Sequence, residues 1–160
     1  MYYEPFYKRF PEIAKEETRR LLVFDDPDLP DDEYALLESY CSEPHCDCRR
    51  VFFNVFSKRR KQIVAVIAYG WESKRYYQKW LGDNNPDILS ELKGPALNTA
   101  SSQSELSSAL LEKVKLVLKD RNYVKRLKRH YALFKKSVAM ETLEESKNLP
   151  VVSKEKISSA

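Results

Sequence analysis

Glycine is unusually scarce in this chain: only Gly70, Gly82 and Gly94 occur among 160 residues. These three lie too far apart to form a glycine-rich phosphate loop or a dinucleotide-binding fingerprint, since both need closely spaced glycines. The sequence therefore argues against nucleotide hydrolysis and nicotinamide chemistry on the scaffolds that use such loops.

Long apolar runs are also missing. No stretch approaches the roughly 20 apolar residues of a membrane span. The N-terminal sequence MYYEPFYKRFPEIAKEE lacks the apolar segment of a secretory signal. We therefore expect no membrane association and a reducing, cytoplasmic compartment. The chain is long enough for one domain with a real core, and 42% of its residues are hydrophobic.

Cysteine is rare but concentrated. The three cysteines lie within eight residues, in Cys41-Ser-Glu-Pro-His-Cys46-Asp-Cys48. An odd number of thiols cannot pair completely, and in a reducing compartment clustered thiols are more often ligands than disulfide partners. Zinc is the leading candidate because cysteine thiolates are its usual structural ligands. A Cys-x-Cys pair also suits Cu(I), and three buried thiols without metal are the alternative.

Three thiolates leave one position of a tetrahedral zinc site open, and the chain has two histidines that could fill it. His45 lies inside the cluster, where the chelate geometry is tight. His130 lies about 80° from the centre of the apolar stripe of the last predicted helix, at the edge of its buried face. We predict that His130 is the fourth ligand. His45, water or no further protein ligand remain the alternatives.

Four segments rich in β-branched and aromatic residues predict strands: 17–24, 33–41, 51–56 and 62–70. Their short connections predict an antiparallel meander. Cys41 would end the second strand, and Cys46 and Cys48 would open the third. The fourth segment is apolar on both faces, which predicts a central position in the sheet.

After Gly70 the apolar residues take up helical spacing. Ser73 and Gly82 are typical of the two ends of a helix, the sequence Ser-Gln-Ser-Glu at 102–105 has the form of a capping box, and Asp120 could cap a last helix. We predict an α+β fold, with an antiparallel sheet of about four strands and C-terminal helices packed on one face. Residues 1–140 would form a single metal-binding domain, and the polar residues 141–160 a flexible C-terminal tail.

Charge is divided unevenly along the chain. Residues 1–48 hold 5 Lys and Arg against 13 Asp and Glu, whereas residues 49–160 hold 23 against 11. Such a division indicates either a solvated basic face or a nucleic-acid partner. The basic residues that could contact phosphates are Lys58, Arg59, Arg60, Lys61, Lys125, Arg126 and Arg129.

Two further arginines, Arg49 and Arg50, directly follow the cysteines. Three thiolates and a neutral imidazole around Zn²⁺ carry a net negative charge, which these guanidinium groups could offset by donating hydrogen bonds to sulfur. Pairing with the acidic N-terminal segment is the alternative.

The stretches YCSEPHCDCRRVFFNVFS, IAYGWES, LKGPALN and LKRHYALFK resemble an uncharacterised bacterial family with a Tyr-Cys…Cys-x-Cys-Arg-Arg-Val core. Some of its members resemble proteins attached to a SEC-C metal-binding motif. The resemblance implies that Cys41, Cys46, Cys48 and His130 belong to one recurring unit. The SEC-C motif itself, a Cys-x-Cys followed by Gly-Ser-Gly-Lys and a second cysteine pair, does not occur in the sequence.

The leading prediction is a non-enzymatic, zinc-stabilised interaction module that binds a protein partner. One alternative is a nucleic-acid-binding protein that uses the basic turn and the last helix. The other is a metal-dependent enzyme with an open zinc site. The non-enzymatic prediction leads because neither Glu43 nor Asp47, the carboxylates beside the cysteines, has a recognisable catalytic context.

Overall fold

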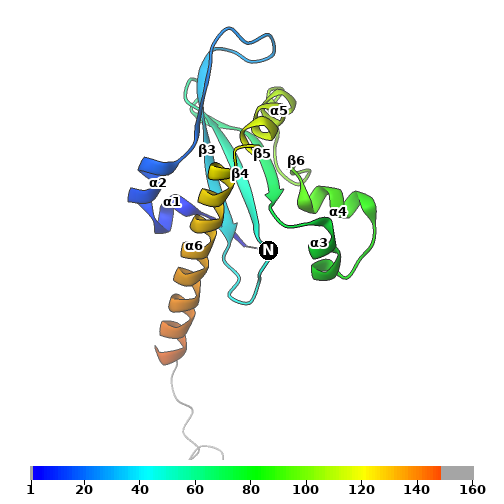
Figure 1. The fold of residues 1–160 in the computed structure, drawn as a ribbon. Coiled ribbons are helices and arrows are strands. Elements are labelled where there is room, and N and C mark those ends of the chain that lie inside the picture. The colour runs from blue at the N-terminus through cyan, green and yellow to red at the C-terminus, as the bar shows by residue number, and fades with distance from the viewer. Residues whose placement is uncertain (1, 149–160) are drawn as a thin grey trace, which may run out of the picture.

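The computed structural model describes residues 2–148, in which an antiparallel sheet forms the centre (Figure 1). The strand order is β1-β3-β4-β5-β6, and β2 also pairs with β3. The strands are β1 (Tyr3–Pro5), β2 (Arg20–Val23), β3 (Asp32–Cys41), β4 (Arg50–Ser57), β5 (Gln62–Gly70) and β6 (Ala96–Leu97). The α+β fold and the meander from β2 to β5 are confirmed, and the short strands β1 and β6 are additional.

Helices lie before and after the meander. They are α1 (Phe6–Arg9), α2 (Pro11–Glu17), α3 (Lys74–Leu81), α4 (Pro86–Lys93), α5 (Ser107–Val117) and α6 (Arg121–Asn148). The predicted ends of α3 are confirmed, because the Ser73 side chain accepts a hydrogen bond from the Tyr76 amide and Gly82 has a φ of 74°. Asp120 likewise accepts a hydrogen bond from the Asn122 amide at the start of α6.

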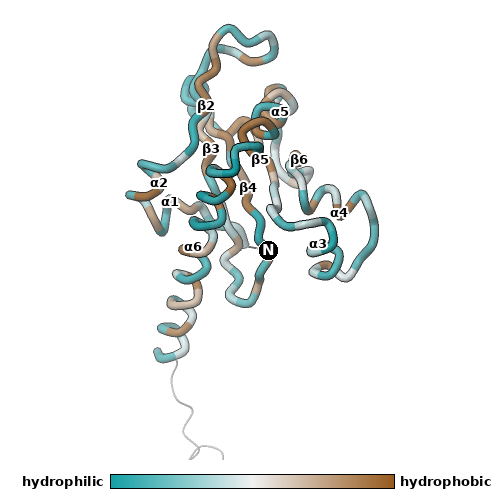
Figure 2. Tube along the Cα trace, viewed as in Figure 1, coloured by the Kyte–Doolittle hydropathy of each residue, from teal (hydrophilic) through white to brown (hydrophobic). Residues whose placement is uncertain are grey.

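The helix α6 covers one face of the sheet (Figure 1). Alternate residues of a strand point to opposite faces, and those of β3 and β4 that face α6 are fully buried. For example, the Phe53 ring lies 6.4 Å from that of Tyr123, and the Tyr40 ring 5.7 Å from that of Phe134. Figure 2 shows the hydrophobic residues concentrated in these strands. Burial of this face supplies most of the core.

The segment after β6 covers the outer edge of β5. The pairing of β6 with β5 involves only Ile67 and Ala68 of β5. The Gln103 side chain then continues it: its amide oxygen accepts from the Val66 N–H at 3.0 Å, and its amide nitrogen donates to the Val66 carbonyl at 2.9 Å. The strand β5 is therefore an interior strand, as predicted, although only two residues of β6 pair with its outer side.

The predicted capping box also has a different role. Ser104 donates from its hydroxyl to the Val64 carbonyl at 2.6 Å, and the same oxygen accepts from the Leu106 amide. The helix α5 begins only at Ser107. This motif therefore connects the edge of β5 to the start of α5 and does not cap the first turn of the helix as a capping box would.

The last helix is longer than predicted. It continues to Asn148 and extends beyond the sheet (Figure 1), so the prediction of a flexible tail is wrong for residues 141–148. Arg9 forms an ion pair with Glu141 at 2.5 Å, which holds this part of α6 to α1. The rest of the predicted tail lies outside the described residues. Within 2–148, no helix is both long and apolar enough to cross a membrane.

Candidate metal centre

The three cysteines converge where β3 ends. Cys41 is the last residue of β3, as predicted, and the three sulfur atoms all lie within 4.8 Å of one another. A tetrahedral zinc site with Zn–S bonds of about 2.3 Å has sulfur atoms about 3.8 Å apart. Separations of no more than 4.8 Å are compatible with this spacing after small side-chain adjustments, so the cluster could hold one ion.

Cys46 and Cys48 lie in the loop between β3 and β4, not in β4 itself. The strand begins only at Arg50 because Arg49 has a φ of 51°, which interrupts the extended backbone. Such a conformation is disfavoured for a residue with a side chain, and it is typical of functional loops held by their surroundings. The prediction that both cysteines open a strand is therefore wrong.

The neighbouring thiols affect one another's pKa. The Cys48 thiol and the Glu43 amide lower the pKa of Cys41 to about 5. The proximity of Cys41, together with burial, raises the pKa of Cys48, and burial raises that of Cys46. A bound cation would replace the thiol protons, because metal ligation requires the thiolate form.

Two residues of α6 hold the cysteine loop. The Tyr131 hydroxyl accepts from the Arg49 amide at 3.2 Å and donates to the Asp47 carboxylate at 3.1 Å. One turn later, Lys135 donates to the carbonyl oxygens of Cys41 and Glu43 at 3.1 and 2.7 Å. The sequence analysis did not predict that these two residues contact the cysteine loop. Their spacing of four could have indicated it, because residues four apart lie on the same side of a helix.

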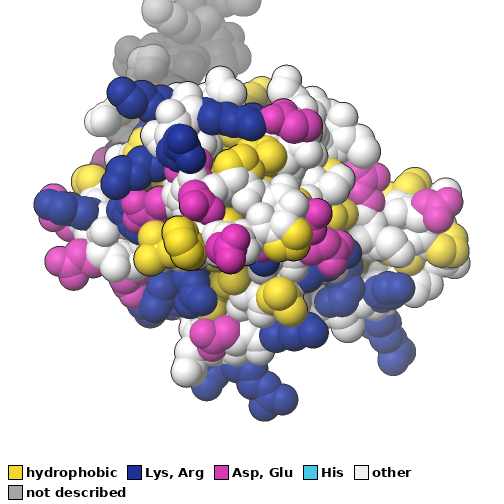
Figure 3. Space-filling model, turned by 90° about the horizontal axis from the view of Figure 1, so that it is seen from above, with side chains coloured by type: hydrophobic (Ala, Val, Ile, Leu, Met, Phe, Trp, Pro, Cys, Tyr) yellow, Lys and Arg dark blue, Asp and Glu magenta, His cyan; other side chains and the backbone are white. Residues whose placement is uncertain are grey.

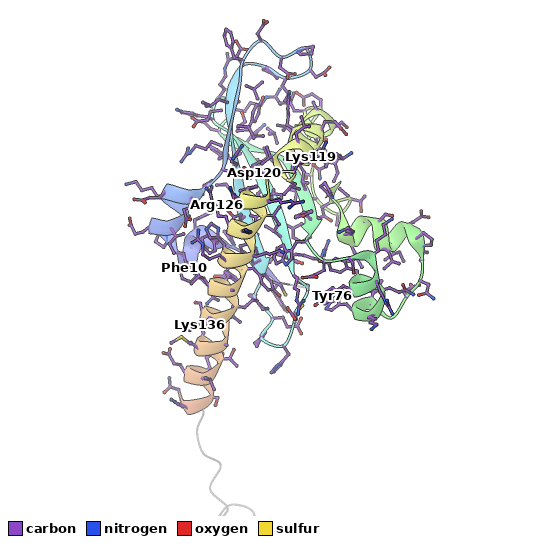
Figure 4. All side chains as sticks on the ribbon, in the orientation of Figure 1. Phe10, Tyr76, Lys119, Asp120, Arg126 and Lys136 are labelled. Carbon is purple, nitrogen blue, oxygen red and sulfur yellow. The ribbon has the colours of Figure 1, made fainter. Side chains whose placement is uncertain are left out.

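The helix α3 holds the loop from another side. Tyr76 donates from its hydroxyl to the Asp47 carbonyl, and Tyr77 to the Arg49 carbonyl at 2.8 Å. Figure 4 labels Tyr76 on α3. The Arg49 guanidinium lies 4.7 Å from the centre of the Tyr76 ring and forms ion pairs with Asp47 and Glu72. It therefore binds carboxylates within and beside the loop, instead of sulfur or the N-terminal segment.

Arg50 reaches the cluster only indirectly. It donates to the Leu92 carbonyl at 2.8 Å and to the Tyr3 hydroxyl at 3.5 Å. The Tyr3 hydroxyl in turn lies 3.9 Å from the Cys48 sulfur. Tyr3 is thus the residue through which a guanidinium group approaches the thiols.

His130 does not join the cysteines, and the prediction that it is the fourth ligand is wrong in this structure. It is fully buried, with Nδ1 2.7 Å from the Glu38 carboxylate and Nε2 3.3 Å from that of Glu17. Its ring stacks on Phe6 at 4.4 Å. The reason is that α1 and α2 cover this side of α6, while Tyr131, the next residue, faces the loop.

The other histidine is exposed in the loop. His45 lies between two of the cysteines in sequence, but neither of its ring nitrogens belongs to the group of converging ligand atoms. The described part of the chain therefore brings three protein ligands together, all of them sulfur.

Most of the basic residues predicted to bind phosphates have acidic or carbonyl partners. Lys58 pairs with Glu33 at 3.2 Å, Arg60 with Glu105 at 2.6 Å, and Arg129 with Glu17. Arg59 and Arg126, the latter labelled in Figure 4, donate to backbone carbonyls, and Lys61 and Lys125 are exposed. Figure 3 shows basic and acidic side chains interspersed on the face seen from above.

No protein-family model, curated protein or solved structure matches the chain. The resemblance to the bacterial family therefore stays a prediction.

Proposed function

We propose that this protein is a non-enzymatic interaction module stabilised by one zinc ion, which Cys41, Cys46 and Cys48 hold. The supporting observation is the convergence of three sulfur atoms within 4.8 Å. The loop that carries two of them is fixed by α3 and α6, so the ligands are largely preorganised. Zinc would cross-link the end of β3 to this loop and so add to folding stability.

The fourth zinc position makes an interaction role preferable to a purely structural one. Among the described residues, the converging donor group contains only the three cysteines. A further ligand would come from His45 after a change in the loop, from solvent or from a bound protein partner. We favour the partner, because Pro44 and His45 are exposed and make this part of the loop accessible to another protein.

A hydrolytic role has less support. Catalytic zinc sites pair the metal with a carboxylate that can accept a proton. Asp47, beside the cysteines, is instead bound by Arg49 and Tyr131, and the Arg49 guanidinium lowers its pKa. A carboxylate held in this way is a weak general base.

Metal analysis of the purified chain tests the proposal. We expect about one zinc per chain, and we expect Cys46→Ser to lose most of it. Chelation should lower the melting temperature of the unaltered protein, because the binding free energy of a structural zinc adds to that of folding. Glu43→Gln, at an exposed side chain in the same loop, is the matched control and should keep both its metal and its melting temperature.

Histidine variants then separate the possible ligand sets. His130→Gln should retain full zinc stoichiometry, since its nitrogens contact carboxylates. If His45→Asn loses zinc as Cys46→Ser does, the fourth ligand is internal and the partner model fails. Protein that contains no metal and melts identically with and without chelator contradicts the whole proposal.

Nucleic-acid binding is the weaker alternative, because cations already paired with carboxylates release fewer counterions on binding phosphates. It predicts retention on a heparin column at low salt, with elution by moderate salt. Lys61→Gln combined with Lys125→Gln should then shorten the retention.

A further inference from the structure

The face of the sheet opposite α6 contains a cavity of about 760 Å³. Its floor is formed by residues that alternate with the core-facing ones, including Leu37, Phe52 and Val66. Its walls come from α4 on one side and from β1 and α1 on the other. Cavities of this size and apolar character are typical of small-molecule sites.

The wall of this cavity contains one buried charged side chain, that of Arg50. It is 5% exposed, and its guanidinium lies 5.4 Å from the centre of the Phe52 ring. Its two hydrogen bonds go to uncharged oxygens, those of Leu92 and Tyr3. Within residues 2–148, no carboxylate forms an ion pair with it, whereas the neighbouring Arg49 has two such partners.

A buried charge without a partner of opposite charge is costly, and it is usually paired or bound to an ion. A guanidinium group has five N–H donors arranged to fit a carboxylate, so Arg50 retains donors for an anion inside the cavity. Glu91 also borders the cavity, but it is exposed on α4 and accepts a hydrogen bond from Thr99.

We propose that this cavity binds a small organic carboxylate with an apolar body. The carboxylate would pair with Arg50, and the apolar body would cover Phe52, Leu37 and Val66. This site is separate from the zinc site and does not depend on it, although Tyr3 lines the cavity and its hydroxyl also lies near the Cys48 sulfur.

Calorimetric titration of the full chain with octanoate, and with 1-octanol as an uncharged match, tests the proposal. Octanoate should bind at least tenfold more tightly than octanol, and backbone amide NMR shifts should map to β4, β5 and α4. Arg50→Gln should weaken octanoate at least tenfold and leave octanol unchanged. Arg75→Gln, an exposed cation on α3, is the control and should change neither.

Val66→Trp fills the cavity and should abolish the binding of both probes, so the test does not depend on the folding of Arg50→Gln. Equal affinities for octanoate and octanol, undiminished octanoate binding to Arg50→Gln or Val66→Trp, or shifts confined to another surface would each overturn the proposal. An absence of octanoate binding at millimolar concentration would overturn it as well.

Discussion

His130 connects three elements through its two ring nitrogens. The carboxylates of Glu38 in β3 and Glu17 in α2 each lie within hydrogen-bonding distance of one nitrogen, and the Tyr40 hydroxyl donates to Glu38 at 2.5 Å. The network then reaches the surface at Arg129, which pairs with Glu17. A buried histidine satisfied in this way fixes the position of α6 relative to the sheet, because leaving any member unpaired would cost free energy.

Acid should weaken this network at Glu17. Arg129 and then His130 lower the pKa of Glu17 from 4.5 to about 2. A depressed carboxyl pKa contributes stability above the unfolded value, and the contribution is lost as the pH falls from about 4.5 to about 2. Glu17→Gln should therefore cost roughly 1–2 kcal/mol of unfolding free energy at pH 6 and much less at pH 2.5.

Urea unfolding at several pH values measures this difference. Glu16→Gln, an exposed neighbour on the same helix, is the control and should follow the unaltered protein at every pH. A Glu17→Gln curve parallel to that of the unaltered protein between pH 6 and 2.5 would show that the carboxylate does not stabilise the fold.

At the scale of elements, α6 and the cysteine loop are joined by Tyr131. Tyr131→Phe keeps the ring, which packs edge-on against Trp71 at 5.0 Å, but removes the oxygen that the Arg49 amide and Asp47 use. We expect a loss of about 1–2 kcal/mol, because a partly buried N–H loses its acceptor. Urea unfolding with chelator present measures it separately from metal binding. Tyr2→Phe, at a 76% exposed residue, should change stability by less than about 0.5 kcal/mol.

The elements differ in how far local sequence determines them. The strands β3, β4 and β5 were predictable because their β-branched and aromatic runs are bounded by turns, and the cysteine cluster because it is contiguous. The strands β1 and β6 have three and two residues, and they form because β3 and β5 offer unpaired edges. No local pattern of that length predicts a strand.

His130 shows the same limit for the site. The helical spacing predicts a position at the edge of the buried face, whereas His130 is fully buried because α1 and α2 cover that edge. Those helices pack there through Phe6, whose ring stacks on the imidazole. Long-range placement of this kind is a property of the assembled sheet and is not encoded within one helix.

At the scale of the whole molecule, the two faces of the sheet have different roles. The face under α6 is closed by large aromatic and aliphatic side chains, which are fully buried. The opposite face leaves residues such as Phe52 and Phe56 partly exposed beside a cavity. Stability therefore depends mainly on one face, which leaves the other able to vary in shape and chemistry around Arg50.

The Gln103 side chain has a consequence for behaviour at high concentration. An open strand edge is a template on which other chains can add strands and aggregate. The Gln103 side chain occupies the N–H of Val66 and shares its carbonyl with the Asn98 amide, so it extends the cover of the β5 edge beyond the two-residue strand. Gln103→Ala should therefore aggregate several-fold faster on mild heating, as measured by light scattering, whereas Gln62→Ala, at the exposed start of β5, should not. Equal rates for the two variants would mean that the edge is protected by other means.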